Sequence, residues 1–178
     1  MIQRVETRDV IGVSTCPAGK FGSQKEGCGL KPKKRKGAYV LIILVSETIT
    51  TVVGQLGKHE FHSGYYSYVG SATGGHSVDL QSRVSRHLRK EKTKHWHIDY
   101  LLSEDAARIV SIIVIPSDEN VECEVNQRIR DELNAKTTVK KFGASDCTKK
   151  CGSHLLYFPH AASIDLLTTE ILDLLRPD

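Results

Sequence analysis

Five side chains with chemically useful groups are spread through the middle of the sequence. They offer two phenols, a guanidinium, an imidazole and a carboxylate: Tyr39, Tyr68, Arg83, His87 and Glu124. A carboxylate can hold a divalent cation, an arginine can stabilise charge on a phosphate, and a phenol or an imidazole can take a proton from water. These residue types together predict metal-assisted hydrolysis of a phosphodiester bond, and a lone carboxylate indicates one metal ion rather than two.

The two kinds of candidate base differ in what they need from their surroundings. A free tyrosine has a pKa of about 10, so Tyr39 would need neighbouring positive charge to act as a base at neutral pH, and Arg83 could supply that charge. His87 titrates in the useful range without help. Each tyrosine taken alone is also typical of a strand, and Glu124 could equally be a solvated residue that favours the N-terminal end of a helix. The chemical interpretation therefore depends on whether the fold brings the five side chains together.

The segments that would position the first four groups are predicted to be three strands and a helix. Residues 39–45 and 48–53 are β-branched and apolar, which predicts a hairpin of buried strands, and residues 65–69 predict a third strand. Ser77 can begin a helix whose apolar residues recur every four positions. Arg83 and His87 fall close together at the edge of that apolar stripe, so we expect both to point into a cleft beside the strands.

The second half of the chain continues the mixture of strands and helices. Residues 109–115 predict a buried strand, residues 122–133 a helix, residues 155–158 a short strand, and a last helix begins near residue 163. Apolar residues of the last helix recur at steps of three and four, which indicates core packing or a dimer seam. The fold class expected is α/β, in the α+β sense of a small sheet flanked by helices.

Composition limits the class of protein. With 178 residues, of which 39% are hydrophobic and 26% charged, the chain can bury a core, which excludes a wholly disordered or collagen-like protein. No apolar run approaches the length of a spanning helix, and charged residues stand where a secretory signal would need an apolar block. We expect a soluble, cytoplasmic protein with no membrane partner.

Basic charge is concentrated at the start of the chain. Residues 1–36 hold nine Lys and Arg against three Asp and Glu, whereas residues 37–178 hold sixteen against eighteen. This division predicts a basic, flexible N-terminal extension over residues 1–36 and a single domain over residues 37–178. The extension could contact nucleic-acid phosphates or could be a solvated tail, and its Cys16 and Cys28 make only half of a zinc site.

A second basic stretch lies on the same predicted helix as Arg83 and His87. Its members that could hold a nucleic-acid backbone are Arg86, Arg89, Lys90, Lys92 and Lys94. The alternative is that they form only a solvated face.

Cysteine and histidine residues in the second half raise the question of a metal site. Cys147, Cys151 and His154 are spaced i, i+4 and i+7, and Cys123 or Asp146 could complete a tetrahedral zinc site. The spacing is not that of a standard zinc finger, so free cysteines and a buried histidine are the favoured alternative. The total of five cysteines is odd and argues against a disulfide framework.

A further histidine pair flanks the single tryptophan. His95 and His97 alternate with Trp96 and Asp99, and on a strand the two imidazoles would share a face and could bind a metal. The favoured alternative is that Trp96 packs and that one histidine makes a structural hydrogen bond or a phosphate contact.

Taken in order, these residues resemble the GIY-YIG nuclease superfamily, and more closely its archaeal and bacterial subgroup named after the Uri endonucleases. The first half of the family signature looks like residues 37–39, the second half like residues 68–72, and its Arg-x-x-x-His helix like residues 83–87. Strings similar to the subgroup follow at residues 95–102, 122–124, 142–147 and 153–155. The metal-binding glutamate of the family corresponds best to Glu124, with Glu122 the less favoured choice.

This resemblance implies a small α/β sandwich with a mainly antiparallel sheet, and endonucleolytic cleavage of DNA with Mg²⁺ or Mn²⁺. It would assign Tyr39 and Tyr68 to the water and the phosphate, Arg83 to the phosphate, His87 to general-base help and Glu124 to the metal. Two glycines, Gly37 and Gly70, would be structural turns at strand ends. The alternatives are a non-catalytic nucleic-acid-binding module on the same fold and an interaction domain stabilised by zinc.

Overall fold

A computed structural model describes residues 36–73 and 79–176. The predicted N-terminal extension, its two cysteines and the predicted helix start at Ser77 lie outside these described residues. The described chain has the predicted α/β class: an antiparallel sheet of four strands and a separate two-stranded sheet are accompanied by four helices. Among the described residues, no helix is long and apolar enough to cross a membrane.

The four-stranded sheet is built around its most buried strand. Strand β1 (Gly37–Val45) lies between β4 (Gly64–Ser71) and β5 (Ala107–Pro116), and β6 (Leu155–Phe158) adds to the outer side of β4. All pairings are antiparallel. Alternate residues of β1 are buried on both faces, because helices cover both sides of the sheet, which explains its nearly continuous apolar sequence. At its start Gly37 has a φ of 141°, and a side chain there would overlap the carbonyl oxygen of Ile115.

The predicted hairpin of residues 39–45 and 48–53 is wrong in its pairing. Strand β2 (Ile49–Val52) pairs with β3 (Lys58–Phe61), not with β1, and the two form their own small sheet. Every second residue of β2 is exposed, so β2 is a half-buried edge rather than a core strand. A single 3₁₀ turn, Gly54–Leu56, lies between β2 and β3.

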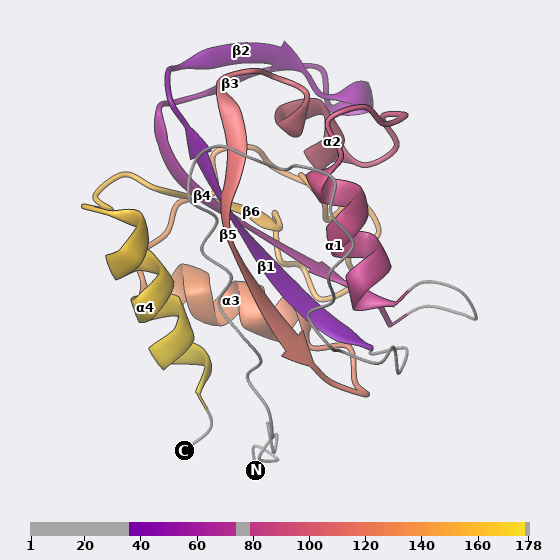
Figure 1. The fold of residues 1–178 in the computed structure, drawn as a ribbon, viewed down its shortest axis with the longest axis vertical. Helices are drawn as coiled ribbons and strands as arrows, with labels where there is room; N and C mark the ends of the chain where they lie inside the picture. Colours follow the sequence, from indigo (N-terminus) through magenta and orange to yellow (C-terminus); the bar gives the residue numbers. More distant parts are fainter. Residues whose placement is uncertain (1–35, 74–78, 177–178) are drawn as a thin grey trace, which may run out of the picture.

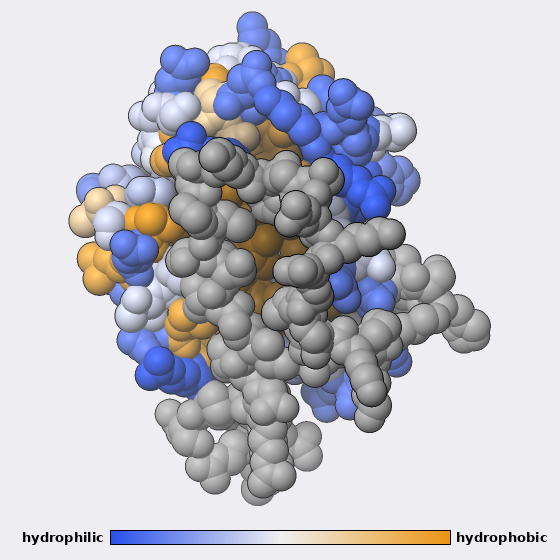
Figure 2. Space-filling model, in the orientation of Figure 1, coloured by the Kyte–Doolittle hydropathy of each residue, from blue (hydrophilic) through white to orange (hydrophobic). Residues whose placement is uncertain are grey.

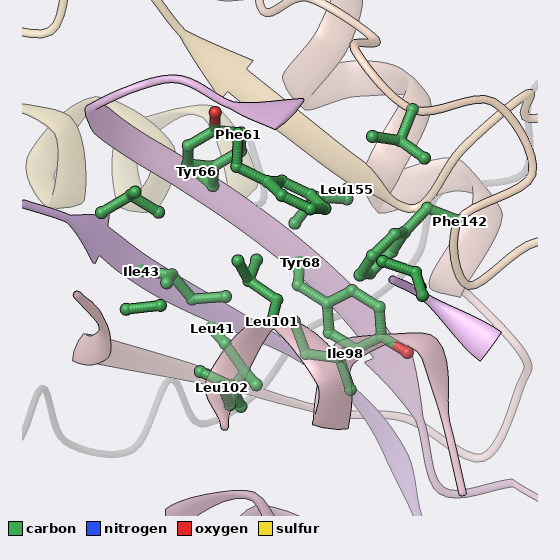
Figure 3. Packing of buried hydrophobic residues seen from close by; sticks show 14 of the residues in the cluster. Leu41, Ile43, Phe61, Tyr66, Tyr68, Ile98, Leu101, Leu102, Phe142 and Leu155 are labelled. Atoms are coloured by element: carbon green, nitrogen blue, oxygen red, sulfur yellow. The ribbon is translucent and has the colours of Figure 1, made fainter. Parts of the chain in front are cut away.

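One face of the large sheet is covered by α1 (Leu80–Leu88) and α2 (His97–Leu102) (Figure 1). The side chain of Asp79 caps α1 by accepting a hydrogen bond from the Ser82 backbone N–H at 2.7 Å. Figure 3 shows the core on this face, where the ring of Tyr68 lies beside Ile98 and its hydroxyl is directed away from the cluster.

The segment around Trp96 is not the strand on which two histidines would share a face. Residues His97–Leu102 form α2, and Asp99 is fully buried, where its Oδ2 accepts the backbone N–H groups of His95 and Trp96, both at 2.9 Å. His97 Nδ1 accepts a hydrogen bond from the backbone N–H of Gly143 at 3.0 Å. The favoured alternative, a structural hydrogen bond from one histidine beside a packed tryptophan, is confirmed.

The other face of the sheet is covered by α3 (Glu122–Glu132) and α4 (Ile164–Leu175). Val125 and Ile129 of α3 and Leu167 and Ile171 of α4 are buried in one cluster with alternate residues of β1. The repeat in the last helix is therefore core packing within this chain, which is one of the two outcomes that its spacing predicts. Two apolar cores thus pack against the two faces of the sheet and hold it in place.

Candidate active site and thiol cluster

A polar cavity of about 360 Å³ lies at the C-terminal end of β4, past the pair formed by Tyr68 and the first residue of β6, Leu155. Strand β6 pairs with Tyr65 to Tyr68 only, so within residues 36–73 and 79–176 no strand pairs with the outer side of the last residues of β4. Side chains from both faces of the sheet reach this free edge. The lining includes two phenols, a guanidinium, a carboxylate and an imidazole: Tyr39, Tyr68, Arg83, Glu122 and His154.

Tyr39 lies at the base of the cavity because Gly70 leaves room for it. The two residues are paired across β1 and β4, and a side chain on Gly70 would overlap the Tyr39 hydroxyl and ring. The hydroxyl is 2.7 Å from Nε2 of His87 on α1. His87 is itself 2% exposed and does not line the cavity, so it contacts the site through Tyr39.

Burial controls the ionisation of this phenol–imidazole pair. It raises the pKa of Tyr39 well above 10, although the guanidinium of Arg83 acts in the opposite direction. Burial lowers the pKa of His87 to about 4, with the nearby Asp99 carboxylate opposing the shift. At neutral pH the pair therefore consists of a protonated phenol and a neutral imidazole that can accept a proton.

Tyr68 presents a second protonated phenol. Its ring packs edge-on against Phe142, with centroids 6.2 Å apart, and burial raises its pKa well above 10. The hydroxyl is left as a hydrogen-bond donor or acceptor in the cavity.

Arg83 supplies the positive charge of the cavity. Its guanidinium carbon lies 5.1 Å from the centroid of the Trp96 ring, and Trp96 also lines the cavity. The buried Nε of Arg83 has no hydrogen-bond partner among residues 36–73 and 79–176. The side chain as a whole is partly buried and lines the cavity, and a guanidinium in that position is suited to an anionic ligand.

The carboxylate that reaches the cavity is Glu122, the less favoured of the two choices made from the sequence. Its Oε2 accepts a hydrogen bond from Ser71 Oγ at 2.8 Å, and its Oε1 lies 3.1 Å from Nδ1 of His154. Glu124 is exposed on α3 and is not part of the lining. The structure thus brings Tyr39, Tyr68 and Arg83 together with Glu122, and does not bring Glu124 to them.

The helix periodicity of α3 explains this difference. Val121, Val125 and Ile129 form the buried stripe. At about 100° per residue, Glu122 lies about 60° from the centre of that stripe and Glu124 about 100° from it. Glu122 is also at the first turn, so it extends past the sheet edge although the rest of α3 packs on the face opposite Tyr39. Measuring each glutamate from the apolar stripe would have favoured Glu122 from the sequence.

One carboxylate at this cavity suits a hard divalent cation, whereas the thiols of Cys123 and Cys147, which also line it, suit softer metals. Mg²⁺ takes one or two protein carboxylates and completes its coordination with waters and substrate phosphates. Glu122 provides one partly buried carboxylate, 18% exposed, that faces a cavity with room for such ligands. The residues present therefore fit a single Mg²⁺ or Mn²⁺ ion.

The basic stretch begins in the last turn of α1 and continues beyond it, and some of its side chains are held by other groups whereas others are exposed. Both Nη atoms of Arg86 donate to the Asp99 carboxylate at 2.9 Å, and its guanidinium lies over the Trp96 ring. Three other basic residues have weaker or exposed contacts: Lys90 pairs with Asp105, Lys92 donates to the backbone oxygen of His87, and Lys94 lies over Tyr100. Arg89 and Lys94 are exposed. Hydrophilic side chains cover α2 and the adjoining end of α1 in Figure 2.

Three thiols and an imidazole gather at one side of the cavity, and three of these four residues, Cys123, Cys147 and His154, are part of its lining. The ligand atoms of Cys123, Cys147, Cys151 and His154 all lie within 4.8 Å of one another. Burial opposes ionisation of Cys147, but hydrogen bonds from the backbone and thiol of Cys151 and from Cys123 lower its pKa to about 6. These four residues are the set that the sequence offered for zinc, with Cys123 rather than Asp146 as the fourth member.

The fold and the site together define an α/β protein with a polar, arginine-containing cavity at a sheet edge. The family described as domain of unknown function DUF123 matches residues 38–176, and the chain belongs to that family. No curated protein and no solved structure gives a significant match to the chain.

Proposed function

We infer that this protein is a metal-dependent endonuclease that hydrolyses phosphodiester bonds of DNA with a single Mg²⁺ or Mn²⁺ ion, in the manner of the GIY-YIG nucleases of the Uri type that its sequence resembles. The observation that carries the proposal is the convergence of Tyr39, Tyr68, Arg83 and Glu122 on one cavity. Phenol, guanidinium and carboxylate are the groups that this hydrolysis needs, and they come from four separate elements.

Tyr39 is the proposed base, with His87 as its proton acceptor. The phenol takes a proton from the attacking water as it passes its own proton to Nε2 of His87, 2.7 Å away. Burial lowers the pKa of His87 to about 4, so its imidazole is neutral and Nε2 is free at neutral pH. The same low pKa makes it a weak base, so the transfer would depend on a cation at Glu122 that makes the attacking water more acidic. Without His87 the Tyr39 phenol, whose pKa is raised by burial, would be a poor base.

Arg83 and Tyr68 are proposed to hold the phosphate. The guanidinium of Arg83, which lines the cavity, would donate to a phosphate oxygen and offset the charge that develops during attack. Tyr68 remains protonated and would donate a second hydrogen bond. Glu122 would hold the cation, which supplies charge stabilisation to the scissile phosphate and its leaving oxygen.

The test is nicking of a supercoiled plasmid by the full chain with Mg²⁺ or Mn²⁺. We expect Glu122→Gln to lower the rate by about a hundredfold or more, equivalent to about 3 kcal/mol of transition-state stabilisation. Glu124→Gln is the matched control on the same helix turn and should cut at the wild-type rate. Circular dichroism of both variants shows whether the fold is kept.

Two results would overturn this proposal. One is a folded Glu122→Gln variant that cuts as fast as the wild type. The other is a wild-type protein that binds DNA in a salt-sensitive manner and cuts under no divalent ion, which would leave the non-catalytic nucleic-acid-binding module as the function.

A further inference from the structure

The thiol cluster at one side of the cavity has the composition and size of a mononuclear metal site. We propose that Cys123, Cys147, Cys151 and His154 bind one zinc ion. Three sulfur ligands and one imidazole are a donor set typical of structural zinc. The proposal does not depend on the nuclease function inferred above.

The distances within the cluster favour a single tetrahedral ion. With Zn–S bonds of about 2.3 Å and Zn–N bonds of about 2.0 Å, a tetrahedral site has ligand atoms about 3.8 Å apart for two sulfurs and about 3.5 Å apart for sulfur and nitrogen. Cys123 Sγ and Cys147 Sγ are 3.5 Å apart, and Cys123 Sγ and His154 Nε2 are 3.9 Å apart. An iron–sulfur cluster needs ligand sulfurs spread around several atoms, so this compact set does not suit one.

The imidazole has the orientation of a metal ligand. His154 Nε2 faces the thiols, 3.9 Å from Cys123 Sγ, and its Nδ1 lies 3.1 Å from Glu122 Oε1, an ion-pair contact whose angles are not those of a hydrogen bond. A histidine that binds zinc through one nitrogen usually donates the other N–H to a carboxylate, which fixes the ring. His154 is also held by its backbone, which hydrogen-bonds to Val69 and Phe142 at 3.0 and 2.8 Å.

The two parts of the chain that carry the thiols would be joined by the ion. Cys123 lies on the first turn of α3, whereas Cys147 and Cys151 lie in the segment 143–152, which has no helix or strand. One stripe of α3 faces this segment: Gln127 Nε2 is 3.8 Å from Cys151 Sγ, and Arg130 Nη1 donates to the Cys151 carbonyl at 3.3 Å. Zinc would fasten the irregular segment to α3 and, through His154, keep Glu122 at the cavity.

Metal content of the full chain tests the proposal. After expression with zinc in the medium, elemental analysis should find about one zinc ion per chain, as a four-ligand structural site predicts. The double variant Cys147→Ser/Cys151→Ser should lose that zinc. The double variant Cys16→Ser/Cys28→Ser is the matched control, with the same number of thiols removed, and should keep it.

Cobalt makes the test independent of the folding of the serine variants. Wild-type protein unfolded in chelator and refolded with Co²⁺ should show thiolate-to-cobalt charge transfer and the intense visible bands of tetrahedral coordination. His154→Cys should retain the metal as a four-thiolate site with a shifted spectrum, whereas His154→Ala should bind it more weakly. Removal of zinc from the wild type should also lower the Tm.

Four outcomes would overturn the zinc site. They are wild-type protein that carries almost no zinc and shows no cobalt bands, iron with inorganic sulfide in its place, a Cys123–Cys147 disulfide in the freshly purified chain, and loss of zinc in the Cys16→Ser/Cys28→Ser control. None of these measurements uses DNA, so a protein that binds zinc and cuts nothing would refute the nuclease proposal and leave the zinc site standing.

Discussion

The ring of Tyr39 occupies the space in which a side chain of residue 70 would stand. The two residues are directly opposite each other on β1 and β4, and the missing side chain of Gly70 allows the phenol to lie across β4 towards His87. The contact between the Tyr39 phenol and the His87 imidazole therefore requires a glycine at position 70.

Gly70→Ala should therefore destabilise the protein and disturb Tyr39. The backbone at Gly70 is not in the left-handed region, so alanine suits the conformation and the cost, about 1–3 kcal/mol, comes from overlap with the ring. Tyr39→Leu removes the overlapping atoms, and in that background Gly70→Ala should cost less than half as much. Urea unfolding of the four proteins in this cycle measures the coupling, and strictly additive costs would contradict it.

His87 should make the stability of the protein fall between about pH 6.5 and pH 4. An unfolded histidine has a pKa of about 6.5, whereas that of buried His87 is about 4, so the unfolded state binds more protons in this window and acid favours it. Above pH 6.5 the neutral His87 costs the folded state nothing. As the pH falls to about 4, the free energy of unfolding decreases by about 3 kcal/mol because of this one histidine.

Denaturant unfolding at several pH values measures this effect. His87→Gln should flatten the decline, because the substituted side chain does not titrate. The control is His160→Gln, the same change of side chain at an exposed position. An unchanged slope in the His87 variant would show that other groups cause the decline.

Arg86 should matter for stability more than for contact with DNA. Its bidentate pair with Asp99 has one partner fully buried, so Arg86→Met leaves a buried carboxylate without its counter-charge. We expect a loss of roughly 2–3 kcal/mol, reduced from the usual cost because Arg86 is one-quarter exposed. Thermal or urea unfolding measures it, with the exposed Arg89→Met as control. If both variants unfold alike, the pair is not structural.

Arg89 and Lys94 are the members of the basic stretch that we expect to contact DNA. If each pairs with one phosphate, Arg89→Gln/Lys94→Gln should reduce the slope of log affinity against log salt by about 2. Fluorescence anisotropy with a labelled duplex at several salt concentrations measures this slope. The charge-matched control is Lys58→Gln/Arg108→Gln, two exposed residues outside the cavity lining. Equal changes in both variants would mean that only net charge counts.

Local patterns predicted several elements correctly because their sequences are strongly periodic or β-branched. Residues 39–45, 65–69 and 109–115 lie in strands, and the helices predicted from residues 122 and 163 begin within a residue of their observed starts. Pairing could not be read in the same way. Residues 48–53 are as β-branched as their neighbours, but nothing in that pattern says that they pair with β3 instead of β1.

In the candidate site, too, some residues could be predicted from the sequence and others only from the tertiary structure. Residue types and order alone indicated Tyr39, Tyr68, Arg83 and the set of three cysteines and a histidine, because phenols, guanidinium and thiols carry their chemistry with them. Which carboxylate joins the phenols was decided by the phase of α3 against the sheet, and which arginine stays available was decided by the burial of Asp99. These outcomes depend on distances between residues far apart in the chain, and such distances exist only once the two cores have packed.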